Sequence, residues 1–194
     1  MVPDDERALI TAAAGGDDDA FAEIVERYQK PLYNLCYRLL GSHGDAEDAS
    51  QETFMKAYRA LSKYDPERPF ISWLLAIAYH RCIDQLRRRR LTWVGLEALF
   101  DRPDRRAPSP EVAAEAGEYA EDVQEALSTL SVKDRAVVVL RYWYDYSYDE
   151  IAETLSLTNS AVKSRLHRAR RELMGVWKID PVTLTESQNE VSPA

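Results

Sequence analysis

Basic and hydroxyl side chains recur between Asn159 and Arg171 at a spacing that places them on one side of an α-helix. At about 100° per residue they fan across a single face, which comprises Lys163, Ser164, His167, Arg168 and Arg171. The other side carries a narrow apolar stripe of Val162, Leu166, Ala169 and Leu173. Donors of this kind contact phosphates and base edges in the major groove of DNA. The stretch predicts a DNA-recognition helix, although a solvated basic surface helix has the same pattern.

The segment before this helix predicts a shorter helix and a tight turn. Ser147 and Glu150 have the spacing of a capping box, in which each side chain satisfies the other's free backbone N–H. The apolar face that follows comprises Ile151, Ala152 and Leu155. Ser156 interrupts it, and three candidate N-caps for the basic helix come next: Thr158, Asn159 and Ser160. Two short helices joined in this way predict a helix-turn-helix.

A second candidate interface lies on a helix predicted from Trp73 to about Arg90. Its core face comprises Ile71, Leu75, Ala78, Cys82 and Leu86. The opposite face, within about 100° of arc, combines aromatic, apolar and charged groups: Trp73, Ile77, His80, Asp84, Arg87 and Arg88. Aromatic rings interleaved with cations suit unstacked bases beside a phosphate backbone. Packing of Trp73 and Ile77 against a neighbouring acidic helix explains the pattern equally well, so both interpretations stay open.

That acidic helix is predicted between Asp45 and Asp65, before a proline-bearing loop from Tyr64 to Ser72. Its predicted core face comprises Ala46, Ala49, Thr53, Ala57, Tyr58 and Leu61. Its outward face carries Asp45, Glu47, Asp48, Gln51, Glu52 and Lys56. Acids near a helix start interact well with the helix dipole, so the pattern alone favours a solvated turn. The alternative is a docking surface for a basic partner.

The remaining segments are also predicted to be helical. Helical spacing runs from Asp17 to about Leu40, with Pro31 marking a kink or a helix start, and from Glu111 to about Thr129. A turn with a solvated His43 is expected over residues 41–44. Ser131 and Asp134 resemble a capping box opening a helix with the predicted core residues Val137, Val138, Leu140 and Tyr142.

The fold class is therefore all-α, with two small helical domains joined by a flexible proline-containing linker, the second domain holding the helix-turn-helix. The predicted boundaries are residues 1–92 and 119–178 for the domains and 93–118 for the linker. Residues 179–194 lack apolar periodicity and are predicted to be a disordered tail.

Composition narrows the functional class. The 194 residues carry a net charge of −8, which argues against a free-standing DNA-binding protein, since such proteins are normally basic. Arginines nevertheless gather at residues 80–90 and again, with lysines, at 160–178. An acidic molecule with two basic segments suggests DNA contact at two places, assisted by a larger partner.

Other classes find little support in the residues. The acidic amino terminus does not resemble a secretory signal, no apolar run is long enough for a membrane span, and Cys36 and Cys82 lack metal-binding spacing. We expect a cytoplasmic protein without cofactor or metal and without membrane contact of its own. No phosphate-cradling glycine loop or nucleophile–base pair is evident, so an enzyme is not expected.

Taken together, the motifs resemble bacterial sigma factors of the extracytoplasmic-function (ECF) type. The resemblance is carried by DAEDASQETF, RPFISWLLAIAYHRCIDQLRRR, the proline-bearing linker and LRYWYDYSYDEIAETLSLTNSAVKSRLHRARREL, in that order. It implies a promoter-specificity subunit that directs RNA polymerase core to −35 and −10 promoter elements and aids DNA melting. The alternative is a stand-alone helix-turn-helix regulator that binds only duplex DNA.

The resemblance also implies roles for individual residues. Docking on the clamp helices of the largest polymerase subunit would involve Asp45, Glu47, Asp48, Gln51, Glu52 and Phe54. Recognition of the −10 element, including its single strand, would involve Asp65, Arg68, Phe70, Ser72, Trp73, Ile77, His80, Arg81, Asp84, Arg87 and Arg88. Recognition of the −35 element would involve Lys163, Ser164, His167, Arg168, Arg165, Arg171 and Tyr148, with further phosphate contacts from Arg141 and Ser147. The polymerase flap and a cognate anti-sigma factor are implied as further partners.

The sequence departs from the family pattern at three places. Tyr79-His80 stands where arginine and asparagine are usual, which bears on base preference at the −10 element. Ser156 replaces the glycine expected in the turn. Ser160-Ala161 replaces Gly-Thr at the start of the recognition helix, which removes a hydroxyl group.

Overall fold

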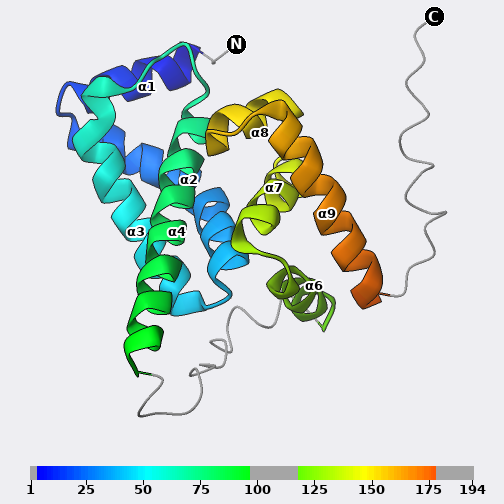
Figure 1. Cartoon of the computed structure of the whole chain (residues 1–194). Coiled ribbons are helices and arrows are strands. Elements are labelled where there is room, and N and C mark those ends of the chain that lie inside the picture. The colour runs from blue at the N-terminus through cyan, green and yellow to red at the C-terminus, as the bar shows by residue number, and fades with distance from the viewer. Residues whose placement is uncertain (1–3, 97–117, 178–194) are drawn as a thin grey trace, which may run out of the picture.

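The computed structural model of the chain describes residues 4–96 and 118–177, and the regular elements within these ranges are all helices (Figure 1). This confirms the all-α prediction. The helices form two groups, one on each side of the gap between residues 96 and 118.

The N-terminal group contains α1 (Asp4–Ala14), α2 (Asp18–Leu40), α3 (His43–Ala60), the short 3₁₀ helix η1 (Leu61–Lys63) and α4 (Phe70–Leu96). Local capping explains where α2 begins and ends and where α3 begins. Asp17 accepts a hydrogen bond from the backbone N–H of Ala20 at the start of α2. Gly41, in the left-handed region at φ 73°, closes α2, and Ser42 then caps α3.

The core of this group lies between α2, α3 and α4. Fully buried aliphatic and aromatic side chains from α2 and α4 fill it, namely Ile24, Leu32, Leu35, Leu39, Phe70, Leu74 and Leu75. The side of α3 that faces them is made mainly of the buried alanines Ala46, Ala49 and Ala57, which let the helices approach closely. Pro31 lies inside α2, which continues through it.

The C-terminal group contains α6 (Glu118–Thr129), α7 (Val132–Trp143), α8 (Tyr148–Leu155) and α9 (Asn159–Trp177). Its core is built from buried residues on all four helices, including Leu127, Val137, Leu140, Ile151, Val162 and Leu166. The capping box of Ser147 and Glu150 is present at the start of α8, as predicted. Helices α8 and α9 therefore form a helix-turn-helix supported by α7.

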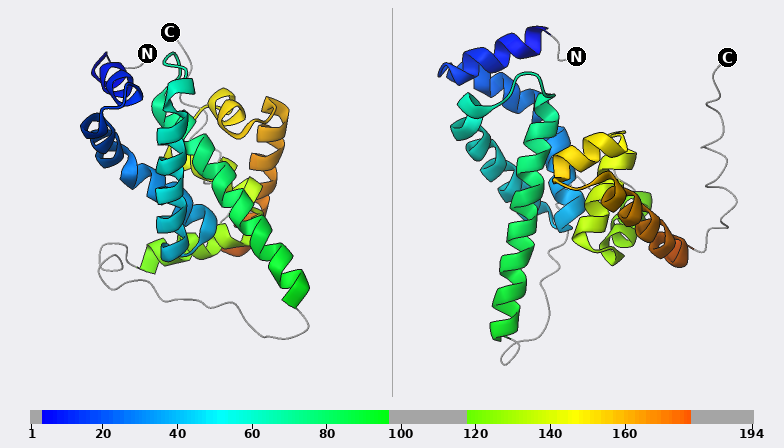
Figure 2. Two further views of the ribbon diagram at one scale, coloured as in Figure 1. Left: turned by 90° about the vertical axis from the view of Figure 1, so that its left-hand side faces the viewer. Right: turned by 45° about the horizontal axis from the view of Figure 1, so that its top comes forward.

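The two groups pack directly on each other, α8 against α4 and α7 against α2 (Figures 1 and 2). The Tyr144 hydroxyl donates to the Pro31 carbonyl oxygen at 2.5 Å. The Arg135 guanidinium donates to the carbonyl oxygen of Leu39 at 2.8 Å, close to the end of α2. The Arg38 guanidinium lies 4.1 Å from the ring centroid of Trp143. Polar and stacking contacts thus hold α7 to the C-terminal half of α2.

Several local predictions were wrong. The turn after α2 is shorter than expected, because α3 already begins at His43. His43 is half-buried instead of solvated, and its Nδ1 hydrogen-bonds the Tyr33 hydroxyl at 2.5 Å. The prediction of Tyr58 and Tyr142 as core residues is wrong, since they are 42% and 57% exposed. Tyr58 contacts Asp18 and Phe21 of α2 but stays at the edge of the packed face.

The long helix of the first group also differs from its prediction. It begins at Phe70, so residues 70–72 form its first turn and belong to the helix rather than to the loop. At its other end it continues to Leu96 through an apolar stretch for which the sequence favoured no structure. The predicted helical residues 111–117, most of the predicted linker and the predicted tail from 179 lie outside the described residues.

Candidate nucleic-acid interface

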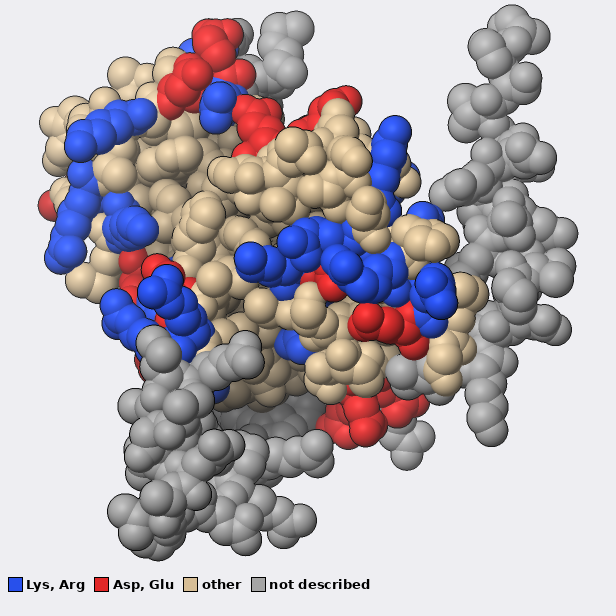
Figure 3. All heavy atoms as spheres, in the orientation of Figure 1, with Lys and Arg blue, Asp and Glu red and all other residues tan. Residues whose placement is uncertain are grey.

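The outer face of α9 presents the residues that the sequence placed there. Lys163, Ser164, His167, Arg168 and Arg171 are exposed. The opposite stripe is buried at Val162, Leu166 and Ala169. Figure 3 shows Lys and Arg side chains gathered in a band across the face that contains α9. This helix can therefore offer donors to an anionic surface without disturbing its own packing.

The turn between α8 and α9 is built around Ser156. Its backbone is left-handed, with φ 54° and ψ 49°, and its N–H donates to the carbonyl oxygens of Ala152 and Glu153. This conformation explains why glycine is usual at the position, since a Cβ is strained there. The Thr158 hydroxyl then accepts from the backbone N–H of Ala161 and so caps α9. Of the three candidate caps, Thr158 performs the role.

Two arginines of α9 point back to α7 and share one carboxylate. Asp134 Oδ1 accepts from Arg165 Nη1 at 2.9 Å and from Arg168 Nη2 at 3.0 Å, and Oδ2 accepts from Arg168 Nε at 3.0 Å. The Ser131 hydroxyl donates to Oδ2 at 2.7 Å. Burial opposes ionisation of Asp134, but the hydrogen bonds from Arg168, Ser131 and Arg165 outweigh it and lower its pKa. The sequence predicted for Asp134 only a capping role at the start of α7.

The other predicted −35 residues lie beside the start of α8. The Arg141 guanidinium is 5.9 Å from the ring centroid of Tyr148, and its Nη1 donates to the carbonyl oxygen of Tyr146 at 3.0 Å. The Ser147 hydroxyl is engaged with Glu150 in the capping box. Arg141 and Tyr148 are thus brought together, whereas Ser147 has a structural partner already.

The predicted −10 loop rests on an aromatic cluster. The ring centroid of Phe70 lies 5.3 Å from that of Tyr64 and 5.5 Å from that of Trp73. Burial raises the pKa of Tyr64 to about 12. Phe70 is fully buried, so its prediction as a base contact is not supported; it holds the loop from beneath. The loop is therefore anchored at its C-terminal end by ring packing.

Two polar residues of this region contact the C-terminal group. Arg68 Nη2 lies 3.1 Å from a carboxylate oxygen of Glu153 on α8, and Arg68 Nε lies 3.7 Å from Asp65 within the loop. The Ser72 and Tyr146 hydroxyls are 2.8 Å apart and hydrogen-bonded. The structure thus brings predicted −10 residues against the helix-turn-helix domain, which the sequence did not indicate.

The predicted DNA face of α4 is only partly exposed. His80, Asp84, Arg87 and Arg88 are exposed, whereas Trp73 and Ile77 are half-buried and pack on the core. The ring of Trp73 packs against those of Tyr64 and Phe70. Arg81, also predicted to contact DNA, instead pairs with Glu52 on α3 through two hydrogen bonds.

The acidic face of α3 is divided between internal pairs and exposed side chains. Asp45 is largely covered and accepts from Gln85 at 2.9 Å and from Arg89, both on α4. Glu47, Asp48 and Gln51 are exposed. Phe54 is buried in the core, so it cannot serve as a surface contact for polymerase in this conformation. Met55 is 54% exposed on the same helix. The sequence could not predict this exposure, because an apolar residue in a helical pattern is normally expected to be buried.

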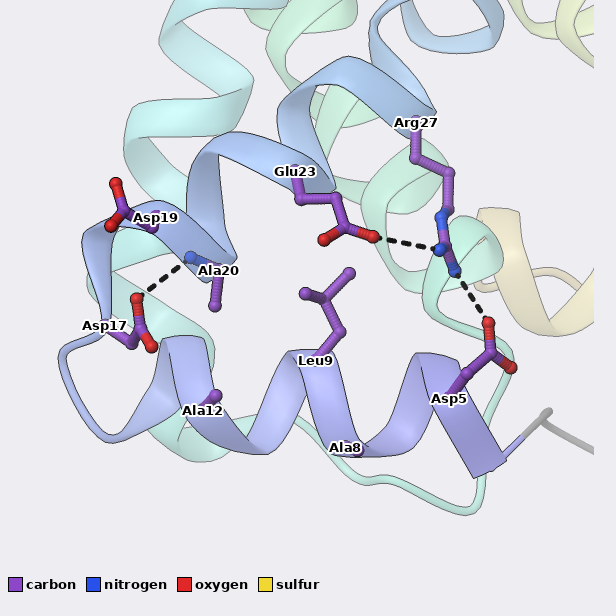
Figure 4. Close-up of a pocket in the computed structure, with 9 residues that line it drawn as sticks. All are labelled: Asp5, Ala8, Leu9, Ala12, Asp17, Asp19, Ala20, Glu23 and Arg27. Carbon is purple, nitrogen blue, oxygen red and sulfur yellow. Dashed lines mark hydrogen bonds and ion pairs between the residues drawn. The ribbon is translucent and has the colours of Figure 1, made fainter.

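Figure 4 shows a shallow pocket between α1 and α2. Leu9 of α1 points toward α2, and Arg27 bridges Glu23 and Asp5 at 3.2 and 3.6 Å. Charged and apolar groups that already contact each other line it. The pocket is thus part of the interface through which α1 packs on α2.

Two further observations concern possible ligands. Cys36 and Cys82 are both buried and free, and the hydrogen bond with Cys36 together with burial raises the pKa of Cys82. Within residues 4–96 and 118–177 no group of three or more His, Cys, Asp or Glu side chains could hold a metal ion. In the same ranges no helix has the length and apolarity needed to cross a bilayer.

Comparison with known proteins identifies the family. Residues 24–92 match the model of sigma-70 region 2, and residues 120–173 match that of sigma-70 region 4. The ECF RNA polymerase sigma factor SigW of Bacillus subtilis is 37% identical over 166 residues, which cover 81% of this chain and 89% of SigW.

Two solved structures share the fold. CnrH in complex with the cytosolic domain of CnrY has a TM-score of 0.68 at 30% identity and covers 91% of this chain and 99% of its own. The sigma factor RpoE in complex with the anti-sigma factor NepR from Bartonella quintana has a TM-score of 0.70 at 24% identity and covers 82% and 98%. With its exposed cationic helix-turn-helix and its matches to both sigma regions, the chain belongs to the ECF sigma factors, the subunits that direct RNA polymerase to promoters.

Proposed function

We propose that the two helical groups divide promoter recognition between them. Residues 1–92 bind the −10 element and the polymerase clamp, residues 119–178 bind the −35 element, and residues 93–118 connect them. The observation that supports this most is the exposed cationic face of α9 on a helix-turn-helix that matches sigma region 4. Neither group has to bind tightly alone, because the polymerase holds both on one promoter.

At the −35 element, α9 enters the major groove. Lys163, Ser164 and His167 are exposed along its outer face and meet base edges. Phosphate contacts come from Arg171 on the same helix and from Arg141 and Tyr148 beside α8, and they set the register of the protein on the duplex. Arg165 and Arg168 also contribute to −35 binding, from the positions in which their hydrogen bonds to Asp134 hold them.

At the −10 element, the N-terminal half of α4 and the preceding loop hold the opened strand. The exposed part of Trp73 and Ile77 supports an unstacked base, and His80 and Asp84 continue the surface along the helix. Arg87 and Arg88 meet phosphates. Asp65 and Arg68 act from the loop, and Ser72 acts from the first turn of α4. Unstacking a base takes a few kcal/mol, which capture of the base offsets.

The polymerase docks on the exposed part of α3. Glu47, Asp48, Gln51 and Glu52 offer acceptors to basic groups on the clamp helices, and Met55 extends the surface with an apolar contact. Asp45 supports this face from within, through Gln85 and Arg89. The C-terminal group meets the polymerase flap.

Membership of the family also bears on how the chain is regulated and in which compartment it acts. The RpoE relative is solved with an anti-sigma factor, which supports a cognate anti-sigma partner for this chain. We propose that the chain acts in the cytoplasm, that it carries no cofactor, and that catalysis belongs to the polymerase.

The decisive experiment is transcription in vitro from genomic fragments with core polymerase, followed by mapping of start sites. We expect start sites preceded by a shared pair of elements. Lys163→Ala should weaken dependence on the −35 element by about 1–3 kcal/mol if Lys163 reads a base edge. A uniform loss on all sequences would instead make Lys163 a phosphate contact. Failure to co-elute with core polymerase, together with binding to duplex DNA alone, would indicate the stand-alone regulator.

A further inference from the structure

The carboxylate of Asp134 has a position that capping does not explain. Asp134 is 3% exposed and lies in the first turn of α7, yet three of its four hydrogen bonds to side-chain donors come from arginines of α9. A capping role needs only Ser131. The carboxylate instead faces the recognition helix, more than thirty residues further along the chain.

The geometry differs for the two arginines. Arg168 offers Nε and Nη2 to the two carboxylate oxygens, a bidentate pair that fixes the plane of its guanidinium. Its side chain is still 53% exposed, and the rest of its five N–H donors stay available to another acceptor. Arg165 is 21% exposed, donates only through Nη1, and its buried Nε has no hydrogen-bond partner within the described part of the chain. Arg168 is thus held at the surface and Arg165 beneath it.

The cluster also contains more positive than negative charge. Two guanidiniums share one carboxylate, so the cluster keeps one net positive charge at the edge of the α9 face. Without the carboxylate the same surface would carry one more positive charge and an arginine free to rotate. Added charge strengthens attraction to any DNA backbone, whereas a fixed guanidinium plane favours a single arrangement of acceptors.

We propose that Asp134 is a positioning residue for −35 recognition, which orients Arg168 toward DNA and restrains Arg165 so that α9 discriminates sequence instead of binding any duplex. This rests on the proposed role of α9 at the −35 element. It identifies a specificity determinant on the supporting helix α7, outside the recognition helix itself.

The test compares holoenzyme carrying the parent chain with holoenzyme carrying Asp134→Asn. Two probes are used: a promoter fragment from which the parent initiates, and the same fragment with its −35 element replaced. Asp134→Asn should lower the ratio of the two affinities at least fivefold, mainly through tighter binding to the replaced fragment. The salt dependence of that binding should steepen by about one unit in log–log slope, an extra loss of threefold to fourfold between 50 and 200 mM salt.

A matched control and a second variant keep the result interpretable. Asp122→Asn removes the same charge from an exposed position on α6 and should leave both quantities unchanged. Arg168→Lys keeps the positive charge but cannot form the bidentate pair, so it should lower the ratio without steepening the salt slope. Because Arg168→Lys leaves the buried carboxylate in place, it tests the bidentate pair even if Asp134→Asn does not fold, and an unchanged ratio in Arg168→Lys would overturn the proposal.

The outcomes separate this proposal from the wider one. A parent that never distinguishes the two fragments would overturn the role of α9 at the −35 element. A parent that distinguishes them while Asp134→Asn and Arg168→Lys do so equally well would overturn the role of Asp134 alone. That role would also be overturned if Asp134→Asn weakens binding to both fragments by one factor with a shallower salt slope.

Discussion

At the scale of single residues, the C-terminal group contains backbone and charge arrangements that go against local preference. Ser156 and Asp145 are the two residues other than glycine with positive φ in the described ranges, at 54° and 51°. Asp134 is a carboxylate buried beside two cations. Each has an energetic consequence that a single substitution can measure.

Replacing Ser156 with glycine should stabilise the protein by about 0.5–1 kcal/mol, because glycine adopts the left-handed conformation without strain. Urea unfolding followed by circular dichroism gives the difference. The control is Ser128→Gly in α6, where the backbone is helical and the loss of helix propensity should destabilise the protein by about 0.5 kcal/mol. Equal effects of both substitutions would show that strain at Ser156 is negligible.

The lowered pKa of Asp134 predicts a pH-dependent contribution to stability. A depressed folded-state pKa means that the stabilisation is complete above the usual carboxyl range and is lost as the pH falls through the folded value. At neutral pH, Asp134→Asn should therefore cost about 2 kcal/mol, less than the 3–5 of a fully buried pair because Arg168 is half exposed. The gap between parent and variant should close in acid, as measured by unfolding at stepped pH. A gap of constant size would mean that charge is not its source.

At the scale of secondary structure, helices α3 and α4 combine packing with recognition on opposite sides. Alanines on α3 bury against α2 and α4, and its charged residues divide between partners on α4 and solvent. The pairs Glu52–Arg81 and Asp45–Arg89 tie the two helices together along their exposed edge. Two ion pairs thus connect α3 to α4 beside the surface proposed for polymerase.

On this surface we expect Asp48→Lys to weaken binding of core polymerase at least tenfold, because it places a cation where basic clamp residues would approach. Its effect on folding stability should stay within about 0.5 kcal/mol, since Asp48 is exposed. Binding can be measured by fluorescence anisotropy of labelled chain. Glu26→Lys, an equal charge change at an exposed position on α2, serves as the control. A matching loss in both variants would point to net charge and not to a docking site.

At the scale of the whole molecule, the closed packing of the two groups conflicts with simultaneous binding to both promoter elements. Elements about 25 base pairs apart are separated by about 85 Å at 3.4 Å per base pair. The two helical groups have radii of gyration of only about 10–12 Å. The chain between residues 96 and 118 can bridge up to about 75 Å, so separation of the groups is sterically feasible. Arg68 and Ser72 would be released from Glu153 and Tyr146 in the process.

A cleavable cross-link between the groups tests this requirement. Cysteines introduced as Arg68→Cys and Glu153→Cys replace an ion pair with a nitrogen–oxygen distance of 3.1 Å, and the native Cys36 and Cys82 are buried away from reagent. Joined by a disulfide-containing bis-maleimide, the chain should still bind core polymerase but lose open-complex formation at least tenfold. Reduction of the cross-linker should restore activity to that of the double-cysteine variant before cross-linking. Full transcription by the cross-linked chain would show that the groups need not separate.

The sequence alone was sufficient for features whose signals lie within a few residues of each other. Capping residues such as Ser147 and Glu150 satisfy backbone groups of the same turn, and the stripe from Val162 to Ala169 follows helical periodicity. The all-α class, the helix-turn-helix and the exposed face of α9 could therefore be predicted. The exposure of Tyr58 and Tyr142 could not be predicted. Both lie at the edge of a face expected to be buried, and periodicity does not show how far a neighbouring helix covers that face.

The tertiary structure alone decided which distant side chains meet. Asp134 binds Arg165 and Arg168 from positions 31 and 34 residues away, and Ser72 meets Tyr146 across 74 residues. It also placed Phe70 in the core and Glu52 beside Arg81. These partnerships depend on how whole helices pack, since burial and charge pairing are properties of the assembled surfaces that no local pattern of residue types encodes.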